Sequence, residues 1–487
     1  MQQLNPSSMN TRFLKLVSVC WTLSFVSFLT PLQAQVNYWS APEESRSVIG
    51  ANDLLPDLPG FDKGYRVQLD LDGFIQQSRK AAKEGSGAIN TSTAVWLPLP
   101  DGTFERFRIL ESSLMEPGLA AKFPEVKSYL IKGVDDPYCA GRMTVSPDLF
   151  NAYFSSLTNE REVFVRRISK TDNSQYVSFR AEDDPVFSEA FTCHWEPEDV
   201  GKDQSSEPLM RMANPYVAGS ELKVFRMSMT VIGELAEAQG WTTSAQALAG
   251  VLTQLDVVNT VYERDLSVRF VLPENNDLLF FLDADTDPFL LENGDQNLRD
   301  NHMITEQYLG IENFDVGLVL LYQGNCCGAN RGICDDDSKG MNMSAFNSLK
   351  VLCHEIGHQF DARHTWAYCN GQGEFEAHEP GSGSNIMGYS TSCGDDYVVP
   401  FISNLFFSVS SIEQMNEYMV DRNCNEVLPT NNTPPTVTVP ASGFCIPTST
   451  PFELTGSGSD AENDNLTYIW EQFNRKGVDW TTAGPPC

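Results

Sequence analysis

The stretch "CHEIGHQFDARHTW", from Cys353 to Trp366, constrains this chain more than any other feature. It holds three of the six histidines in the 487-residue sequence, at intervals of four and six. On an α-helix, residues four apart lie about 40° apart on one face, so His354 and His358 can bind one ion together. Glu355 can then reach a metal-bound water without being a ligand. The pattern predicts a metal site, and the alternative is a helix that is rich in histidine without binding metal.

The third histidine, His364, cannot share that helical face, so the chain must turn after Phe360. In such motifs the residue that ends the helix is usually a glycine in the left-handed conformation. Here this residue is Asp361, and Asp and Asn are the non-glycine residues that best tolerate the conformation. We therefore expect a left-handed Asp361 to bring His364 back beside the other two histidines.

A second feature lies downstream, in the stretch "EPGSGSNIMGYSTSCG". Met387 stands in a turn after a loop rich in glycine and serine, and Tyr389 follows two residues later. The long histidine motif and this methionine turn together resemble the metzincin zinc endopeptidases. The sequences of both segments are most similar to those of bacterial secreted members related to the reprolysins (adamalysins), and the resemblance covers roughly residues 222–424.

The resemblance implies roles for five side chains. His354, His358 and His364 would bind one catalytic Zn²⁺, Glu355 would be the general base, and Met387 would form a floor beneath the metal. Three neutral imidazoles leave zinc one open position for a water, whose pKa zinc lowers towards about 7. The implied activity is the hydrolysis of peptide bonds in protein or peptide substrates.

Two points at the site stay open. Tyr389 matches a tyrosine that in astacins and serralysins binds or releases zinc and stabilises the oxyanion, and a buried hydrogen-bonding tyrosine is the alternative. A thermolysin-like site would instead take Glu374, Glu376 or Glu379 as the third ligand. That stretch reads as a loop rather than a helix, so the metzincin interpretation explains the residues better.

The elements around the motif predict an α/β fold. Strand–helix alternation in this order indicates a mixed sheet flanked by helices. The resemblance implies an α/β (α+β) metzincin catalytic domain with a mixed five-stranded sheet and an active-site helix. We expect strands at residues 222–233, 266–272 and 314–322, and helices at residues 243–265, 295–309 and 344–360.

The chain divides into several domains by composition. Arg12 and Lys15 precede the apolar run "LVSVCWTLSFVSFLT", and Ala34 supplies a small residue at a plausible cleavage point. This pattern is typical of an export signal, with an uncleaved anchor as the alternative. Alternating strand patterns follow, then the catalytic region, a Pro/Thr stretch and the opening of a β-sandwich. We expect a signal peptide at residues 1–34, a mostly β propeptide-like domain at 35–212, the metzincin domain at 213–428, a linker at 429–440 and a partial immunoglobulin-like (PKD/cadherin-like) domain at 441–487.

The net charge of −32 argues against a nucleic-acid partner, because phosphate would be repelled. No segment after the apolar run is long and apolar enough to cross a bilayer, so we expect the mature protein to be secreted. The many carboxylates leave room for Ca²⁺. Asp460, Glu462 and Asp464 alternate in "DAENDN" and could form a calcium-binding loop, although a solvated turn is the alternative that we favour.

Of the twelve cysteines, export would remove Cys20 with the signal peptide, and most of the eleven that remain should be paired in an oxidising compartment. Cys369 and Cys393 bracket the methionine turn, and we expect a disulfide between them. By analogy with the family, the N-terminal segment would cover the cleft and be removed near residues 205–220. Cys193 or Cys139 could hold such a zymogen latent as a zinc-bound thiolate, with disulfide bonding as the alternative for each.

We therefore expect a secreted zinc endopeptidase that is made as a zymogen. The alternative is a secreted adhesion or binding protein whose metzincin-like domain does not catalyse. The intact Glu355 argues against this alternative.

Overall fold

The computed structural model describes most of the chain after the predicted signal peptide, which lies outside the described residues. None of the helices in the described ranges has the length and apolarity that a membrane span requires. The described ranges are residues 36–41, 54–55, 63–86, 93–156, 161–184, 218–289, 294–322, 327–366, 378–379, 381–389, 405–439, 446–447 and 450–471.

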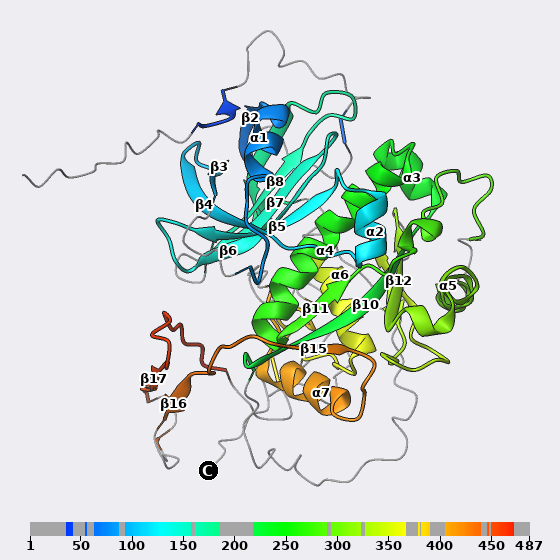
Figure 1. The fold of residues 1–487 in the computed structure, drawn as a ribbon. Helices are drawn as coiled ribbons and strands as arrows, with labels where there is room; N and C mark the ends of the chain where they lie inside the picture. The colour runs from blue at the N-terminus through cyan, green and yellow to red at the C-terminus, as the bar shows by residue number, and fades with distance from the viewer. Residues whose placement is uncertain are drawn as a thin grey trace, which may run out of the picture. The chain divides into compact units, whose positions relative to one another are not determined.

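The N-terminal part is a nine-stranded antiparallel sheet in the order β1-β2-β9-β8-β7-β6-β5-β4-β3 (Figure 1). The alternating patterns predicted as strands form the hairpins β3–β4 and β7–β8, because every second side chain can pack into the sheet's apolar core. The expected mostly β character is present. The elements are β1 (Trp39–Ser40), β2 (Tyr65–Leu69), α1 (Leu71–Ser78), β3 (Ala94–Pro98), β4 (Phe104–Glu111), α2 (Pro117–Lys122), β5 (Lys127–Gly133), β6 (Cys139–Val145), β7 (Phe150–Ser156), β8 (Arg161–Arg167) and β9 (Gln175–Arg180).

The second sheet is mixed, in the order β11-β10-β12-β14-β13, with β15 paired to β10. β10, β11, β12 and β14 run parallel, whereas β13 and β15 are antiparallel to their neighbours. The elements are β10 (Glu221–Val231), α3 (Gly233–Gln239), α4 (Ser244–Leu266), β11 (Val268–Val271), α5 (Gly294–Leu309), β12 (Val316–Leu321), β13 (Gly328–Ala329), β14 (Asn342–Ala345), α6 (Leu349–Gln359), α7 (Val409–Met419) and β15 (Glu426–Pro429).

Two expectations about this sheet need correction. The sheet has six strands rather than five, because Glu426–Pro429 joins β10 antiparallel and Pro429, the first residue of the expected linker, pairs with Glu221. The helix expected at 344–360 begins five residues later. Ser344 pairs with Leu320 in β14, so backbone hydrogen bonding to the parallel neighbour outweighs the helical pattern at that end.

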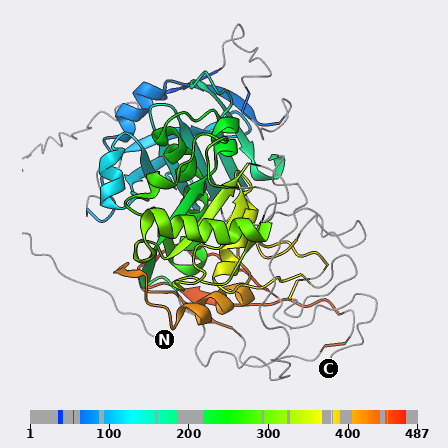
Figure 2. The ribbon, with the colours of Figure 1, turned by 90° about the vertical axis from the view of Figure 1, so that its right-hand side faces the viewer.

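Helices cover both faces of the mixed sheet. α4 and α6 pack against each other on one face, and α5 lies on the other (Figures 1 and 2). Thr243 caps α4, since its hydroxyl accepts a hydrogen bond from the Gln246 N–H. α4 is buried on nearly all sides, which fits its contacts with both sheets.

The nine-stranded sheet meets α4 through a buried cluster of charged side chains. Asp256 of α4 accepts hydrogen bonds from Arg142 Nε at 3.3 Å, Ser128 Oγ at 2.5 Å and Thr144 Oγ1 at 2.6 Å. Arg142 also donates to Glu263 at 3.1 Å. Burial raises the pKa of Asp256, and the charge of Arg142 opposes that rise.

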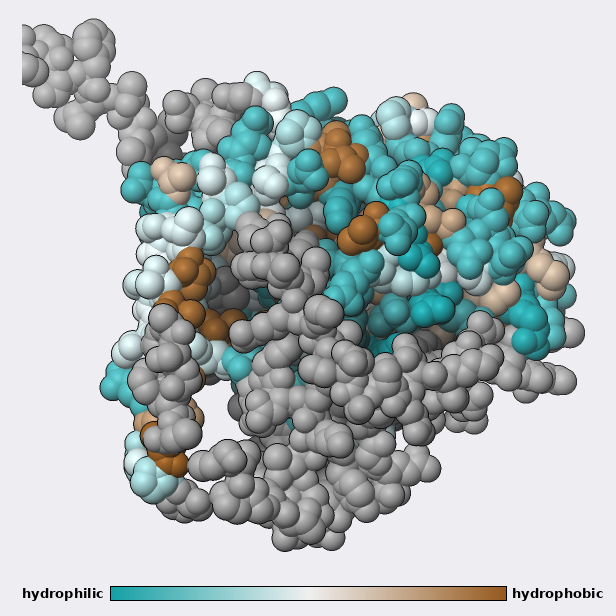
Figure 3. Space-filling view, turned by 90° about the horizontal axis from the view of Figure 1, so that it is seen from below, coloured by the Kyte–Doolittle hydropathy of each residue, from teal (hydrophilic) through white to brown (hydrophobic). Residues whose placement is uncertain are grey.

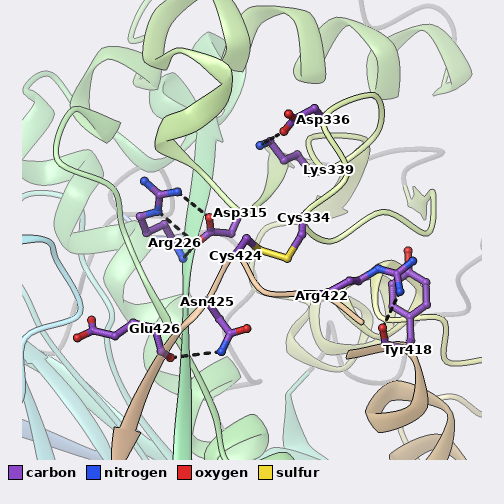
Figure 4. The surroundings of a disulfide bond; sticks show 10 residues. All are labelled: Arg226, Asp315, Cys334, Asp336, Lys339, Tyr418, Arg422, Cys424, Asn425 and Glu426. Carbon is purple, nitrogen blue, oxygen red and sulfur yellow. Dashed lines mark hydrogen bonds and ion pairs between the residues drawn. A yellow bond between two sulfur atoms is a disulfide. The ribbon is translucent and has the colours of Figure 1, made fainter. Parts of the chain in front are cut away.

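A disulfide joins Cys334 to Cys424 and so ties the loop before β14 to the segment between α7 and β15 (Figure 4). The Cys334 N–H donates to the Asp315 carbonyl, and the Asp315 carboxylate forms an ion pair with Arg226 at 2.7 Å. The end of the catalytic region is therefore fastened to the start of β12 and to β10.

The other cysteines divide into three groups. Cys327 is also disulfide-bonded. Cys139 and Cys353 are free and buried, so the disulfide considered for Cys139 is not formed. Burial raises the pKa of Cys139 to about 12, so its thiol stays protonated. The remaining cysteines lie outside the described residues: Cys20, Cys193, Cys326, Cys369, Cys393, Cys445 and Cys487.

Near the C-terminus, β16 (Thr436–Thr438) and β17 (Ser457–Ser459) form a two-stranded antiparallel sheet. β16 lies inside the expected linker, which is therefore not wholly irregular. The Asp460 carboxylate accepts the backbone N–H groups of Glu462 and Asp464, an arrangement typical of a turn. The immunoglobulin-like sandwich and the calcium site remain predictions. The described surface shown in Figure 3 is mostly hydrophilic, with hydrophobic residues in small separate groups.

Candidate metal centre

The three predicted histidines lie together in the interior. His354 and His358 are on α6, and His364 follows the turn at its end. His358 Nε2 lies 3.0 Å from His354 Nε2 and 3.2 Å from His364 Nε2. All three side chains are buried, and their nitrogens form a group that could hold one metal ion. Glu355 is also buried, one residue after the first histidine.

A hydrogen bond at Nδ1 of each helical histidine determines which ring nitrogen carries the proton. His354 Nδ1 lies 2.8 Å from the Ile386 carbonyl oxygen, and His358 Nδ1 lies 2.7 Å from that of Ala362. A carbonyl oxygen only accepts, so each Nδ1 must be the donor. Burial lowers the pKa of both rings well below the ordinary value, with repulsion between the histidines as a further cause. Both rings are therefore neutral, with a lone pair on each Nε2.

A cation bound between the facing Nε2 atoms would be held by neutral imidazole nitrogens, the form in which histidine binds zinc. Zinc–nitrogen bonds of about 2.0–2.1 Å in tetrahedral geometry put neighbouring ligand atoms roughly 3.3 Å apart. The observed separations of 3.0 and 3.2 Å fit this spacing. Backbone carbonyls that accept from the second nitrogen are the usual outer partners of zinc-binding histidines. The donor set therefore fits Zn²⁺.

Asp361 has a φ of +67°, which confirms the predicted left-handed conformation. Its N–H donates to the His358 carbonyl at 2.9 Å, and the N–H of Ala362 donates to the Gly357 carbonyl at 3.0 Å. These two bonds form a Schellman motif, the usual device for ending a helix with a left-handed residue. The motif also places the Ala362 carbonyl that orients His358, and Arg331 lies 3.5 Å from the Asp361 carboxylate.

The methionine turn packs under α6. Met387 is fully buried, and a Cβ added at Gly357 would lie 2.9 Å from its Sδ, so any larger residue there would displace the methionine side chain. The Asn385 side chain accepts the Met387 N–H at 2.9 Å. Ile386, between them, provides the carbonyl that orients His354. Met387 therefore lies against the histidine-bearing helix, and its role as a floor beneath the metal stays a prediction.

Tyr389 lies at the edge of the histidine group. Its ring centroid is 4.7 Å from that of His364 and 5.3 Å from that of Trp366, and its N–H donates to the Ser382 carbonyl at 2.7 Å. The side chain is partly exposed, in contrast to the histidines. A role in binding zinc or stabilising the oxyanion remains a prediction.

Glu379, one of the three glutamates considered as an alternative ligand, is engaged elsewhere. Its Oε2 accepts from Thr365 Oγ1 at 2.6 Å, and its Oε1 accepts the N–H groups of Ser384 and Asn385. Sequence reasoning missed these contacts, because only folding brings the loop beside Thr365. Glu374 and Glu376 lie outside the described residues.

Residues 222–418 match the family model described as metallo-peptidase family M12B, reprolysin-like. This range begins in β10, ends in α7 and contains the three histidines, Glu355 and the methionine turn. No curated protein matches the chain. Residues 222–418 are therefore a reprolysin-like metallopeptidase domain of family M12B, which identifies the chain as a zinc metalloendopeptidase.

Proposed function

We propose that this chain is a secreted endopeptidase in which His354, His358 and His364 hold one catalytic Zn²⁺ and Glu355 is the general base. The observation that carries the proposal is the buried group of three histidine nitrogens, in which His358 Nε2 lies 3.0 Å from His354 Nε2 and 3.2 Å from His364 Nε2, with second hydrogen bonds from the two helical rings to backbone carbonyls. The substrates are proteins or peptides, in keeping with the family of the domain.

Zinc bound to three histidines supplies a Lewis acid and lowers the pKa of a bound water towards about 7. Side chains of the protein bind the metal, transfer the proton and orient the substrate. The two helical histidines stay neutral because they are buried. Glu355 takes the proton of the attacking water and delivers it to the leaving amine. The Tyr389 hydroxyl, beside His364, donates a hydrogen bond to the carbonyl oxygen of the scissile peptide.

We further propose that the protein is exported through the apolar N-terminal segment and made as a zymogen. The charge pattern around residues 12–34 supports export. The N-terminal domain has the position of a propeptide, and Cys193 is the candidate latency thiol. Sequencing the N-terminus of the secreted protein tests export, with a start near Gln35 expected, and comparing activity before and after limited proteolysis tests latency.

The central experiment joins metal content to activity. Residues 35–487 are expressed in an oxidising host, zinc per chain is measured, and casein cleavage is followed with and without a chelator. Glu355→Gln is compared with Glu417→Gln, the same change at an exposed position on α7. We expect one zinc per chain, with activity lost to the chelator and to Glu355→Gln but kept in the control.

Two results would contradict the proposal. A chain without zinc would overturn the metal site. Bound zinc without activity, even after limited proteolysis of the N-terminal domain, would favour the adhesion or binding protein.

A further inference from the structure

Glu379 and the residue before it, His378, contact two other segments of the catalytic domain. One carries Thr365, directly after the third histidine, and the other is the loop that enters the methionine turn. The carboxylate receives four hydrogen bonds. At Oε2 the donor is Thr365 Oγ1 at 2.6 Å, and at Oε1 the donors are the Ser384 N–H at 2.8 Å, the Asn385 N–H at 3.1 Å and Ser384 Oγ at 3.2 Å.

Backbone hydrogen bonds hold the same segments in place around Thr365. Its carbonyl accepts the N–H groups of His378 at 2.9 Å and Glu379 at 2.8 Å, and its own N–H donates to the Met387 carbonyl at 3.3 Å. Asn385 Oδ1 lies 3.2 Å from the Thr365 hydroxyl, farther than Glu379 Oε2. The single hydroxyl proton therefore goes to the carboxylate.

Two glycines leave space for this carboxylate. A Cβ added at Gly383 would lie 2.6 Å from Glu379 Oε2, and one added at Gly388 would lie 3.1 Å from the same atom. Gly383 also has a φ of +70°, which most other residues adopt at a cost. The local backbone is therefore arranged around the carboxylate, which ties Thr365 to the start of the methionine turn.

We propose that Glu379 is a positioning residue for the metal centre. It holds Thr365, and so the chain that presents His364. It also holds Asn385, the neighbour of the Ile386 carbonyl that orients His354. Charge-assisted hydrogen bonds to a carboxylate are about twice as strong as neutral ones. Losing them frees two of the three expected ligands to move apart.

This inference rests on the proposed function, and metal affinity tests it more directly than activity. Mutating a residue that hydrogen-bonds to a zinc ligand or holds it in place typically lowers metal affinity by about 10- to 100-fold. In the 35–487 chain, Glu379→Gln keeps the size of the side chain but turns an amide NH₂ towards one of the donors. We expect its zinc dissociation constant, measured by competition with a chelating dye, to rise by about 10- to 100-fold. One metal should still bind at saturation.

Cobalt substitution reports on the ligands themselves. We expect the visible absorption of the Co²⁺ protein to change in Glu379→Gln, because its intensity and position depend on the arrangement of the ligands. Glu417→Gln is the matched control and should leave both affinity and spectrum unchanged.

Substitutions at Thr365 keep the test valid if Glu379→Gln folds poorly. Thr365→Ser retains the hydroxyl and should bind zinc nearly as the wild type does. Thr365→Val removes it and should weaken binding as Glu379→Gln does. The double variant Thr365→Val/Glu379→Gln should be less impaired than the sum of the two, because both changes remove one shared hydrogen bond.

The outcomes separate this inference from the proposed function. If the wild type binds zinc and Glu379→Gln binds it equally tightly, with only a lower melting temperature of the metal-free protein, Glu379 stabilises the loop and the inference is overturned. Equal zinc affinity of Thr365→Ser and Thr365→Val would overturn it as well. A wild type that binds no zinc would overturn the proposed function, and this inference with it.

Discussion

Nε2 of His358 lies 3.0 Å from Nε2 of His354, while Nδ1 of each ring donates to a backbone carbonyl oxygen. The two Nε2 atoms therefore face each other in a buried site, beside the Nε2 of His364. A cation bound by all three rings would join α6 to the segment that follows it. Stability should accordingly depend on metal as strongly as activity does.

The first prediction concerns metal removal. With free zinc at 1,000 times its dissociation constant, binding adds about 4 kcal/mol to the free energy of unfolding. For a domain of this size we expect a chelator to lower the melting temperature by roughly 10 °C. Differential scanning calorimetry with and without chelator measures the change. In His354→Ala/His358→Ala the chelator should have no effect, and an equal shift in that variant would contradict the prediction.

The second prediction concerns Asp361, whose φ is +67°. A left-handed conformation costs an ordinary residue about 1–2 kcal/mol, and a β-branched one more. We expect Asp361→Val to lower the free energy of unfolding by at least this amount and to weaken zinc binding, because the turn also places the Ala362 carbonyl. Asp361→Asn is the control and Asp361→Gly should be at least as stable as the wild type. Urea unfolding and zinc competition measure the two effects. An Asp361→Val variant with the stability and zinc affinity of the wild type would contradict the prediction.

The third prediction concerns the contact between Arg142 and Asp256. Both side chains are buried, with 1% and 3% of their surface exposed. Arg142→Met leaves the Asp256 carboxylate buried with its hydroxyl partners but without the arginine. Breaking a buried pair in this way costs about 3–5 kcal/mol. We expect the free energy of unfolding to decrease by that amount, as measured by urea titration. The N-terminal domain should also separate more easily from the catalytic domain.

An exposed pair serves as the control for this change. Arg106 and Asp135 lie 2.7 Å apart at the surface, so Arg106→Met should change stability little. If Arg142→Met and Arg106→Met lower the free energy of unfolding by the same amount, burial does not determine how much an ion pair contributes to stability.

The fourth prediction concerns pH and Glu162 of β8. Burial raises the pKa of Glu162 to about 7, while Arg264, the Leu405 backbone and the Tyr153 hydroxyl act in the opposite direction. Burial raises the pKa of Cys353, and the negative charge of Glu162 acts in the same direction. The folded protein binds this proton more tightly than the unfolded chain does. The contribution of Glu162 to the free energy of unfolding therefore falls as the pH rises from about 4.5 to about 7.

Replacing Glu162 with Gln removes this dependence. The variant should match the wild type near pH 4 and be the more stable one near pH 8. The upper limit of the gain is about 3 kcal/mol, which solvent at the partly exposed edge of the side chain reduces. Urea unfolding across this pH range measures it. Glu182→Gln, at an exposed position, should show no such gain, and a parallel pH dependence in wild type and Glu162→Gln would contradict the prediction.

Local patterns predicted much of the fold. The spacing of apolar residues predicted α4, observed at Ser244–Leu266 with Thr243 as its cap. The left-handed Asp361 followed from its place at the end of the histidine-bearing helix, together with the tolerance of Asp for this conformation. Where two local structures competed, the sequence was insufficient. Ser344 fits a helical pattern, yet it pairs with Leu320, because a strand partner 24 residues away is invisible to a local pattern.

The sequence by itself determined the chemistry of the site. The spacing of the three histidines and the adjacent Glu355 predicted a metal site, because ligand type and helical geometry are local properties, and the resemblance carried by this motif and by Met387 implied a zinc peptidase. Only the tertiary structure decided what holds these groups in place. The carbonyl of Ile386, the contact of Met387 with Gly357 and the carboxylate of Glu379 come from residues distant in sequence. Hydrogen bonds and close packing between distant segments depend on how the chain folds, and one-dimensional spacing carries no record of them.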